Sequence, residues 1–333
     1  MLKTAAGKVA YKKPWWKSNA AIAVHVVAVY VGVSLYMNSL VKKEQAKRDL
    51  EYAKADGVVQ SDDEKPLALA EPKSVTNVDV QPTIWSNAAK FDQLANIYDC
   101  EINWEERWMG LSLMRRHLVR QARGDVVEVS SGTGRNISYY PEASTGKLNS
   151  LTFVDASREM LEVSIKKMDA DARRFRVDRD RPDSEIPNRF LHMDAADLAH
   201  EVADDTYDTV VETFGLCSVG PTFGPDCKHE ANSDPAHPVT ILNELARICR
   251  PDGKVLLLEH GKSHYKWLNE MMDRKAKSHF LRWGCWPNRD IEALVRQSDL
   301  EIEYISRWHF GTTFYIVARP KSIAKSDHAG SLQ

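Results

Sequence analysis

A glycine-rich turn followed by a distant carboxylate is the arrangement in this chain most suited to chemistry. Residues 126–136 read Val-Val-Glu-Val-Ser-Ser-Gly-Thr-Gly-Arg-Asn, and Asp155 ends the next predicted strand. Gly132 and Gly134 can adopt positive φ and leave room for a ligand against the backbone. A strand–turn–helix junction with an acidic residue about 20 positions later is typical of a ribose site. We therefore predict a nucleoside-bearing ligand here, with a helix beginning near Asn136.

The turn differs from those that bind phosphates. It lacks the third glycine of the dinucleotide fingerprint, and no Gly-Lys-Ser/Thr follows it as in a P-loop. Glu128 precedes the turn, and a carboxylate suits a cationic ligand better than a pyrophosphate. S-adenosylmethionine carries an ammonium and a sulfonium but no phosphate, so the sequence favours this cofactor. A nicotinamide cofactor is the minor alternative.

Later strand ends supply the remaining cofactor contacts. The Asp155 carboxylate can accept from both ribose hydroxyls, and Asp194 with Ala195 could read the adenine edge. Thr213 and Phe214 end a fourth strand near the transferable methyl. Either aspartate could instead be a helix N-cap. The predicted cofactor-binding residues are Tyr98, Glu128, Ser130, Gly132, Thr133, Gly134, Asp155, Ala156, Met160, Asp194, Ala195, Thr213 and Phe214.

Methyl transfer from a sulfonium is an in-line displacement, for which a protein mainly supplies alignment. A base is needed only if the acceptor arrives protonated. His309, His260 and Glu259 lie near strand ends and are the candidates, with a structural role as the alternative for each. Cys217 is better explained as a core residue of the fourth strand than as a nucleophile. No Asn/Asp-Pro-Pro-Tyr/Phe follows strand four, which argues against methylation of nucleic-acid bases.

From Asp125 onward, predicted strands and helices alternate, which indicates an α/β fold with a parallel sheet. Residues 85–122 show helical apolar spacing before this region. The predicted strands are Val126–Val129, Ser150–Val154, Arg189–His192, Thr209–Glu212, Val255–Leu258, Ile302–Ser306 and Phe314–Ala318. The predicted helices include Arg158–Lys167, Pro238–Ile248 and Arg289–Gln297.

The N-terminus has a different composition. Residues 1–19 carry five lysines and no acid, and residues 20–41 are almost continuously apolar. As a helix this stretch spans ~33 Å, enough for a bilayer core of ~30 Å. We predict a basic leader (1–19), a single transmembrane helix (20–41), a charged helix and flexible tether (42–83), a catalytic domain (84–320) and a tail (321–333).

A basic leader before a single span suits a mitochondrial inner-membrane protein, and also an uncleaved anchor of the endoplasmic reticulum. The leader has lysines where transit peptides prefer arginine. Lys42, Lys43, Lys47, Arg48 and Lys54 follow the span, so the charge balance leaves the topology open.

The overall composition narrows the partners. The 333 residues are 43% hydrophobic and 28% charged with a formal charge of -2, so no nucleic-acid partner is expected. The five cysteines include no CxxC pair, which indicates reduced thiols rather than a disulfide framework or zinc site. Cys227, His229 and His237 share a polar loop, 220–238, but no metal site is predicted.

Several segments carry a family resemblance. Residues from about 90 to 318 resemble a class I S-adenosylmethionine-dependent methyltransferase. The segments Phe214–Val219, Leu257–Gly261, Trp283–Asp290 and His309–Thr313 are similar to the membrane-anchored methyltransferase-like proteins of fungal mitochondria and of animal endoplasmic reticulum and lipid droplets. These resemble in turn the quinone-biosynthesis C-methyltransferases. The resemblance implies a Rossmann-like, mostly parallel seven-stranded sheet with helices on both faces and an antiparallel last strand.

Two departures from the family pattern concern the turn. Ser130 stands where many methyltransferases have the first glycine, and Ser131 where this group often has cysteine. The resemblance implies an anchored methyltransferase acting on a small lipophilic or thiol acceptor, or on a membrane-associated protein. The alternative is a methyltransferase fold that serves as an assembly factor or scaffold of a mitochondrial complex, with little or no activity.

Overall fold

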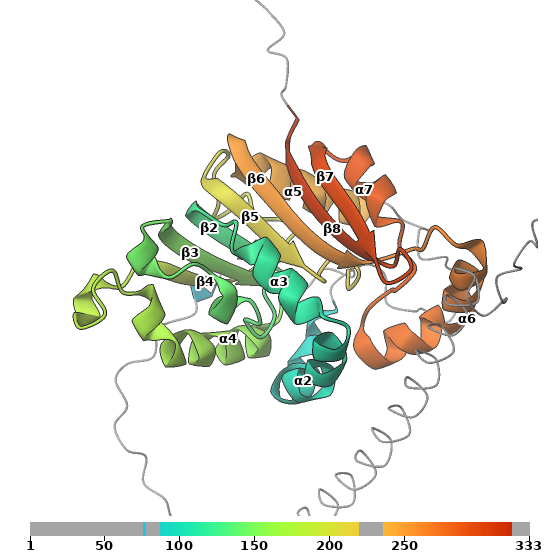
Figure 1. The fold of residues 1–333 in the computed structure, drawn as a ribbon, viewed down its shortest axis with the longest axis horizontal. Coiled ribbons are helices and arrows are strands. Elements are labelled where there is room, and N and C mark those ends of the chain that lie inside the picture. Colours follow the sequence, from blue (N-terminus) through green and yellow to red (C-terminus); the bar gives the residue numbers. More distant parts are fainter. Residues whose placement is uncertain (1–75, 78–86, 220–235, 322–333) are drawn as a thin grey trace, which may run out of the picture. The chain divides into compact units, whose positions relative to one another are not determined.

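The computed structural model describes residues 76–77, 87–219 and 236–321, which form one sheet with helices on both faces (Figure 1). The strands are β1 (Thr76–Asn77), β2 (Gly124–Val129), β3 (Leu148–Asp155), β4 (Asn188–His192), β5 (Tyr207–Thr213), β6 (Cys249–His260), β7 (Leu300–Trp308) and β8 (Thr313–Pro320). Their order across the sheet is β1-β4-β3-β2-β5-β6-β8-β7.

The predicted α/β fold is confirmed. Each predicted strand is present and is at least one residue longer than predicted, and β8 alone runs antiparallel to its neighbours β6 and β7 among the described strands. The short edge strand β1 is additional, and it pairs in parallel with β4. It lies inside the segment predicted as a tether. Because the chain runs outward from β2 to β4 and then crosses to β5, a crevice forms at the carboxyl ends of β2 and β5.

The described helices are α2 (Ala88–Trp108), α3 (Leu111–Val119), α4 (Arg158–Ala170), α5 (Ala236–Ile248), α6 (Lys266–Trp283) and α7 (Ile291–Gln297). The helix expected from Asn136 does not form, and only a 3-10 turn at Ile137–Tyr139 follows the glycine-rich turn. Pro141 explains this difference, because the residue before a proline avoids the helical region. Tyr140 is extended, with ψ of 149°.

Two apolar layers enclose the sheet. Val126 points into the layer shared with α3 and α4, whereas the adjacent Val127 points into the layer shared with α5 and α7. This alternation follows from the two-residue period of a strand. Figure 1 shows α3 in front of the sheet and α5 and α7 behind it. The helices thus close both faces and leave the strand ends available for a site.

The predicted leader, span, most of the tether and the tail beyond residue 321 lie outside the described residues. Among the helices that the structure describes, none has both the length and the apolar composition needed to cross a membrane.

Candidate active site

A cavity opens at the carboxyl ends of β2, β3, β4 and β5, and we call it the strand-end cavity. All but two of the predicted cofactor residues line it, namely Tyr98, Ser130, Gly132, Thr133, Asp155, Ala156, Met160, Asp194, Ala195, Thr213 and Phe214. The two exceptions are Glu128 and Gly134. The wall also includes residues that sequence reasoning missed, among them Asn87, Phe91, Arg115, Arg135, Ser157 and Met193.

Asp155 is held in one orientation by two backbone amides. The N–H of Gly132 donates to one carboxylate oxygen at 2.7 Å, and the N–H of Ser157 donates to the other at 2.8 Å. Burial raises the pKa of Asp155 to about 6, against the opposing effect of these two donors. The carboxylate is therefore a fixed acceptor in the cavity wall, which suits the two hydroxyls of a ribose.

The backbone conformation of the turn after β2 favours glycine at position 130. Ser130 has φ of 53°, a left-handed conformation that costs little only for glycine. Gly132 also has positive φ, and no atom lies within 4 Å of where its Cβ would stand. At Gly134 a Cβ would lie 2.5 Å from the Ser164 hydroxyl of α4. Gly132 therefore leaves room for a ligand, whereas Gly134 permits close packing of the turn on α4.

Glu128 lies behind the cavity rather than in its wall. Its carboxylate accepts hydrogen bonds from Asn136 Nδ2 at 3.0 Å and from the Tyr140 hydroxyl at 2.7 Å. Burial raises its pKa to about 7, outweighing these donors and the charge of Arg115. Glu128 therefore holds Asn136, which in turn donates to Thr213 Oγ1 at 3.0 Å. The contact of Glu128 with a cationic ligand stays a prediction.

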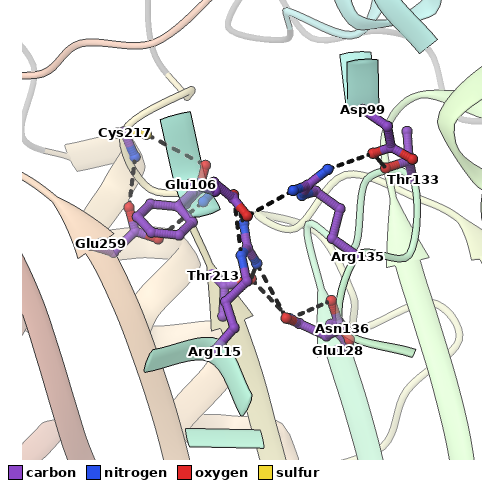
Figure 2. A network of polar contacts seen from close by, with 12 residues as sticks. Asp99, Glu106, Arg115, Glu128, Thr133, Arg135, Asn136, Thr213, Cys217 and Glu259 are labelled. Atoms are coloured by element: carbon purple, nitrogen blue, oxygen red, sulfur yellow. Dashed lines mark hydrogen bonds and ion pairs between the residues drawn. The ribbon is translucent and has the colours of Figure 1, made fainter. Parts of the chain in front are cut away.

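Arg115 of α3 is the centre of this buried network (Figure 2). Its guanidinium donates to Glu106 Oε1 at 2.9 Å and 3.2 Å, to Asn136 Oδ1 at 3.2 Å and to Thr213 Oγ1 at 2.7 Å. It also lies 4.6 Å from the centre of the Phe214 ring. One sequence signal could have identified it, because a charge at this position falls on the apolar face of the helix.

Hydrogen bonds and ion pairs of charged side chains hold helix α2 against the turn after β2. Asp99 accepts from the Thr133 hydroxyl at 2.8 Å and from Arg135 at 2.9 Å, and it pairs with Lys167. Arg135 also donates to Glu106 Oε2 at 2.8 Å. Burial acts to raise the pKa of Asp99, but these three partners outweigh it and the pKa is lowered. Figure 2 shows how these contacts bring α2 against the turn after β2.

A second pocket adjoins the first, and we call it the side pocket. It shares Phe91, Tyr98, Arg115, Phe214 and Ser218 with the strand-end cavity. Its remaining wall is Ile102, Glu105, Glu106, Met109, Leu111, Cys217, His260, His279, Trp283 and Cys285. Most of the exposed surface of this wall is apolar, and Glu105, Glu106 and Arg115 add charged groups to its imidazole and thiol groups.

The predicted base candidates separate in the structure. His260 lines the side pocket, and its ring centre lies 4.4 Å from that of Phe214. Burial lowers its pKa to about 4, so the imidazole is neutral near pH 7. Glu259 is buried and accepts from the N–H groups of the 215–217 loop. His309 contacts Thr313 and the Met109 carbonyl, both at 2.9 Å, and lines a separate groove.

Within the described residues, no group of three or more metal-binding side chains could hold an ion. Cys227 and His229, two of the three residues considered for a metal cluster, lie outside those residues.

Comparisons with known proteins bear on this arrangement. A family model described as "Methyltransferase domain" matches residues 127–257. The chain is 36% identical over 251 residues to "Methyltransferase OMS1, mitochondrial" of Saccharomyces cerevisiae, with 73% of this chain and 48% of that protein covered. It is 28% identical over 188 residues to the human "Thiol S-methyltransferase TMT1A", with 54% and 62% covered. The chain thus spans less than two thirds of either relative.

Among solved structures, this chain is similar to the DhpI–SAM–HEP complex at 17% sequence identity and a TM-score of 0.43. The match covers 70% of this chain and 95% of that chain. The family model and the relatives confirm the resemblance that the motifs predict. They also confirm S-adenosylmethionine as the cofactor that this family implies.

Proposed function

This chain belongs to the class I S-adenosylmethionine-dependent methyltransferases, and we propose that it is a membrane-anchored mitochondrial enzyme. We propose as its acceptor a small lipophilic or thiol molecule, or a membrane-associated protein. One observation carries the proposal: the strand-end cavity, with its fixed Asp155 carboxylate, opens beside a mostly apolar pocket. The two spaces suit a polar cofactor and a lipophilic acceptor, with Phe214 in the wall between them.

The cofactor residues have distinct proposed roles. Asp155 accepts from the ribose hydroxyls, since its two oxygens are already oriented by backbone donors. Asp194 and Ala195 follow β4 and lie where the adenine edge would be read. Gly132 leaves the backbone accessible to the amino-acid end. The Glu128–Asn136 contact supports this turn from behind.

The acceptor enters the side pocket in this proposal. Ile102, Met109, Leu111 and Trp283 supply apolar surface there, which favours a lipophilic ligand through burial of its apolar area. The human relative is named a thiol S-methyltransferase, which supports a thiol acceptor for this chain too. The apolar surface of the wall thus favours molecules with an apolar body.

When bound, the cofactor supplies an activated methyl group on its sulfonium, and the chain supplies alignment and a dry environment. A protonated acceptor must lose its proton, and we propose that His260, whose ring lies beside Phe214 in the wall of the side pocket, accepts it. We assign this role to His260 in preference to Glu259 and His309. The Glu259 oxygens are occupied by backbone donors, and His309 faces another groove.

The membrane anchor and compartment rest on sequence and likeness. The apolar segment 20–41 is long enough to span a bilayer, and the yeast relative is named as mitochondrial. We propose single-pass insertion in the inner membrane, with the endoplasmic reticulum as the alternative. Carbonate extraction of fractionated mitochondria tests this, because an anchored protein stays in the pellet. Release of the full-length protein into the supernatant would contradict the anchor.

The activity is tested by incubating detergent-solubilised full-length protein with methyl-labelled cofactor and a panel of alkyl thiols, lipophilic phenols and membrane-protein extract. We expect labelled product from at least one class, and its loss in His260→Gln. Label transfer that is unaffected by His260→Gln would contradict the assigned base. A parallel titration of NAD tests the nicotinamide alternative.

The scaffold alternative has one structural argument in its favour, since Ser130 is strained where glycine would be relaxed. It predicts normal cofactor binding with no labelled product from any acceptor class. It also predicts co-purification with a mitochondrial complex that survives Asp155→Ala. Repeated turnover on an acceptor would decide against it.

A further inference from the structure

Two cysteine side chains meet in the wall of the side pocket. Cys217 follows β5 and Cys285 follows α6, and both side chains line the side pocket, close enough for each thiol to shift the pKa of the other. The N–H of Trp286 donates to the carbonyl of Cys217 at 2.7 Å, so the backbones of the two segments are held side by side. Both thiols are free. Because the residue next to Cys285 hydrogen-bonds directly to Cys217, the two cysteines lie on adjacent backbone segments, as a disulfide requires.

The surroundings make the two thiols unequal. Hydrogen bonds from Cys217 and His279, together with the positive charge of Arg289, outweigh burial and lower the pKa of Cys285. The hydrogen bond to Cys285, burial and the nearby Glu259 raise the pKa of Cys217. These opposite shifts make Cys285 the more acidic of the two thiols, which suits Cys285 to the role of attacking cysteine and Cys217 to that of resolving cysteine.

We propose that Cys217 and Cys285 form a modification site, a dithiol that a hydroperoxide oxidises to a disulfide across the side pocket. The Cys285 sulfur attacks the peroxide, the O–O bond breaks, and a sulfenic acid forms as one water or alcohol leaves. The Cys217 sulfur then attacks the sulfenic sulfur, the S–S bond forms, and a water leaves. Two thiols thereby lose two electrons and two protons, and one hydroperoxide is reduced.

The disulfide would form in the wall of the side pocket. Both cysteines line the side pocket, and neither lines the strand-end cavity. Oxidation removes two thiols from the pocket wall and ties the loop after β5 to the segment after α6. Given the proposed function, oxidation would block the acceptor and spare the cofactor.

The chain offers two matched control cysteines. Cys100 is exposed on α2, and Cys249 is buried at the start of β6, where burial raises its pKa to about 12. If exposure alone decided which thiol reacts with peroxide, Cys100 would be oxidised first. If the pairing of the two thiols decides it, Cys285 is oxidised first. Cys227 lies outside the described residues, so the experiment uses full-length protein carrying Cys227→Ser.

The test is peroxide titration followed by thiol trapping and peptide mapping by mass spectrometry. We expect the Cys217–Cys285 disulfide as the main product, reversed by dithiothreitol, retained in Cys100→Ser and Cys249→Ser, and absent in Cys285→Ser. Two results would overturn the proposal. One is that both thiols stay free when Cys100 is already oxidised. The other is that each is oxidised separately to a sulfinic acid without a disulfide.

Calorimetry with S-adenosylmethionine on the oxidised and reduced protein forms a second arm. Because the two cysteines lie outside the cofactor cavity, we expect the dissociation constants to agree within about twofold. A larger loss of affinity for S-adenosylmethionine on oxidation, reversed by dithiothreitol, would show that the disulfide also affects the strand-end cavity. No cofactor binding in either state would defeat the proposed function and leave the mapped disulfide standing.

Discussion

The strand-end cavity and the side pocket share Tyr98, Arg115 and Phe214 but are assembled from different kinds of structure. The cavity is built by turns that directly follow consecutive strands, so backbone amides fix its key acceptor, Asp155. The pocket is built where α2, α6 and the loop after β5 meet, so long-range packing fixes its side chains. The cofactor side is therefore set by local geometry, and the acceptor side by tertiary structure.

The largest effect is expected at the shared wall. Arg115→Met leaves Glu106 with one cationic partner fewer and removes the donors to Asn136 and Thr213, so the free energy of unfolding should fall by about 3 kcal/mol. Thermal and urea unfolding measure this. Arg116→Met, on the exposed face of the same helix, is the control and should change stability by less than about 0.5 kcal/mol. Equal effects of the two substitutions would show that the buried network does not join the two regions.

The second largest effect is expected on cofactor affinity, and it distinguishes the strand-end cavity from the side pocket. Asp155→Ala should weaken S-adenosylmethionine binding by about 30-fold, because a charged hydrogen-bond acceptor contributes about 2 kcal/mol. His260→Gln is the matched variant in the side pocket and should leave the affinity within about twofold. Calorimetry measures both. A larger loss in His260→Gln than in Asp155→Ala would reverse the assignment of the two spaces.

The pH dependence of binding sharpens the role of Asp155. Its pKa is raised to about 6 in the free protein, mainly by burial, with Asp92 adding to the rise and His192 opposing it. The ionised form accepts from the ribose, so protonation competes with binding and the affinity falls as pH decreases below about 6. The expected slope is about tenfold per pH unit. Asp155→Asn should show no such slope, and an equal slope in that variant would assign the titration to another group.

The smallest effect concerns strain in the turn. Ser130→Gly removes the cost of a left-handed serine, so the free energy of unfolding should rise by about 1 kcal/mol. Ser138→Gly, in the neighbouring 3-10 turn, is the control and should stabilise nothing, because its conformation does not need glycine. Differential scanning calorimetry of the three proteins gives the comparison. A loss of stability in Ser130→Gly would show that the serine side chain matters more than its backbone.

The same contrast explains what the sequence could predict. Asp155, Asp194 and Phe214 were predictable because each follows a strand that has a clear apolar pattern. Glu128 was placed correctly on its strand, but its contact with Asn136 and Tyr140 depends on packing. The short turn in place of a helix after Asn136 is also predictable, because Pro141 stands in the sequence and disfavours a helical Tyr140.

The side pocket had no comparable signal. His279 and Cys285 lie more than sixty residues from Cys217, and nothing in their spacing indicates that they meet. Helix α6, which brings them there, was absent from the predicted helices. Charged side chains on apolar faces, such as Arg115, are the one pattern that could have pointed to this interior network.

The central claim is that the strand-end cavity binds S-adenosylmethionine through Asp155. Its most direct test is calorimetric titration of the full-length wild-type protein and Asp155→Ala with S-adenosylmethionine, with NAD as the comparison ligand. The structure predicts one saturable site in the wild type, a much weaker site in the variant, and no heat from NAD. Absence of binding at about 1 mM cofactor, which corresponds to about −4 kcal/mol, or equal affinity in Asp155→Ala, would contradict it.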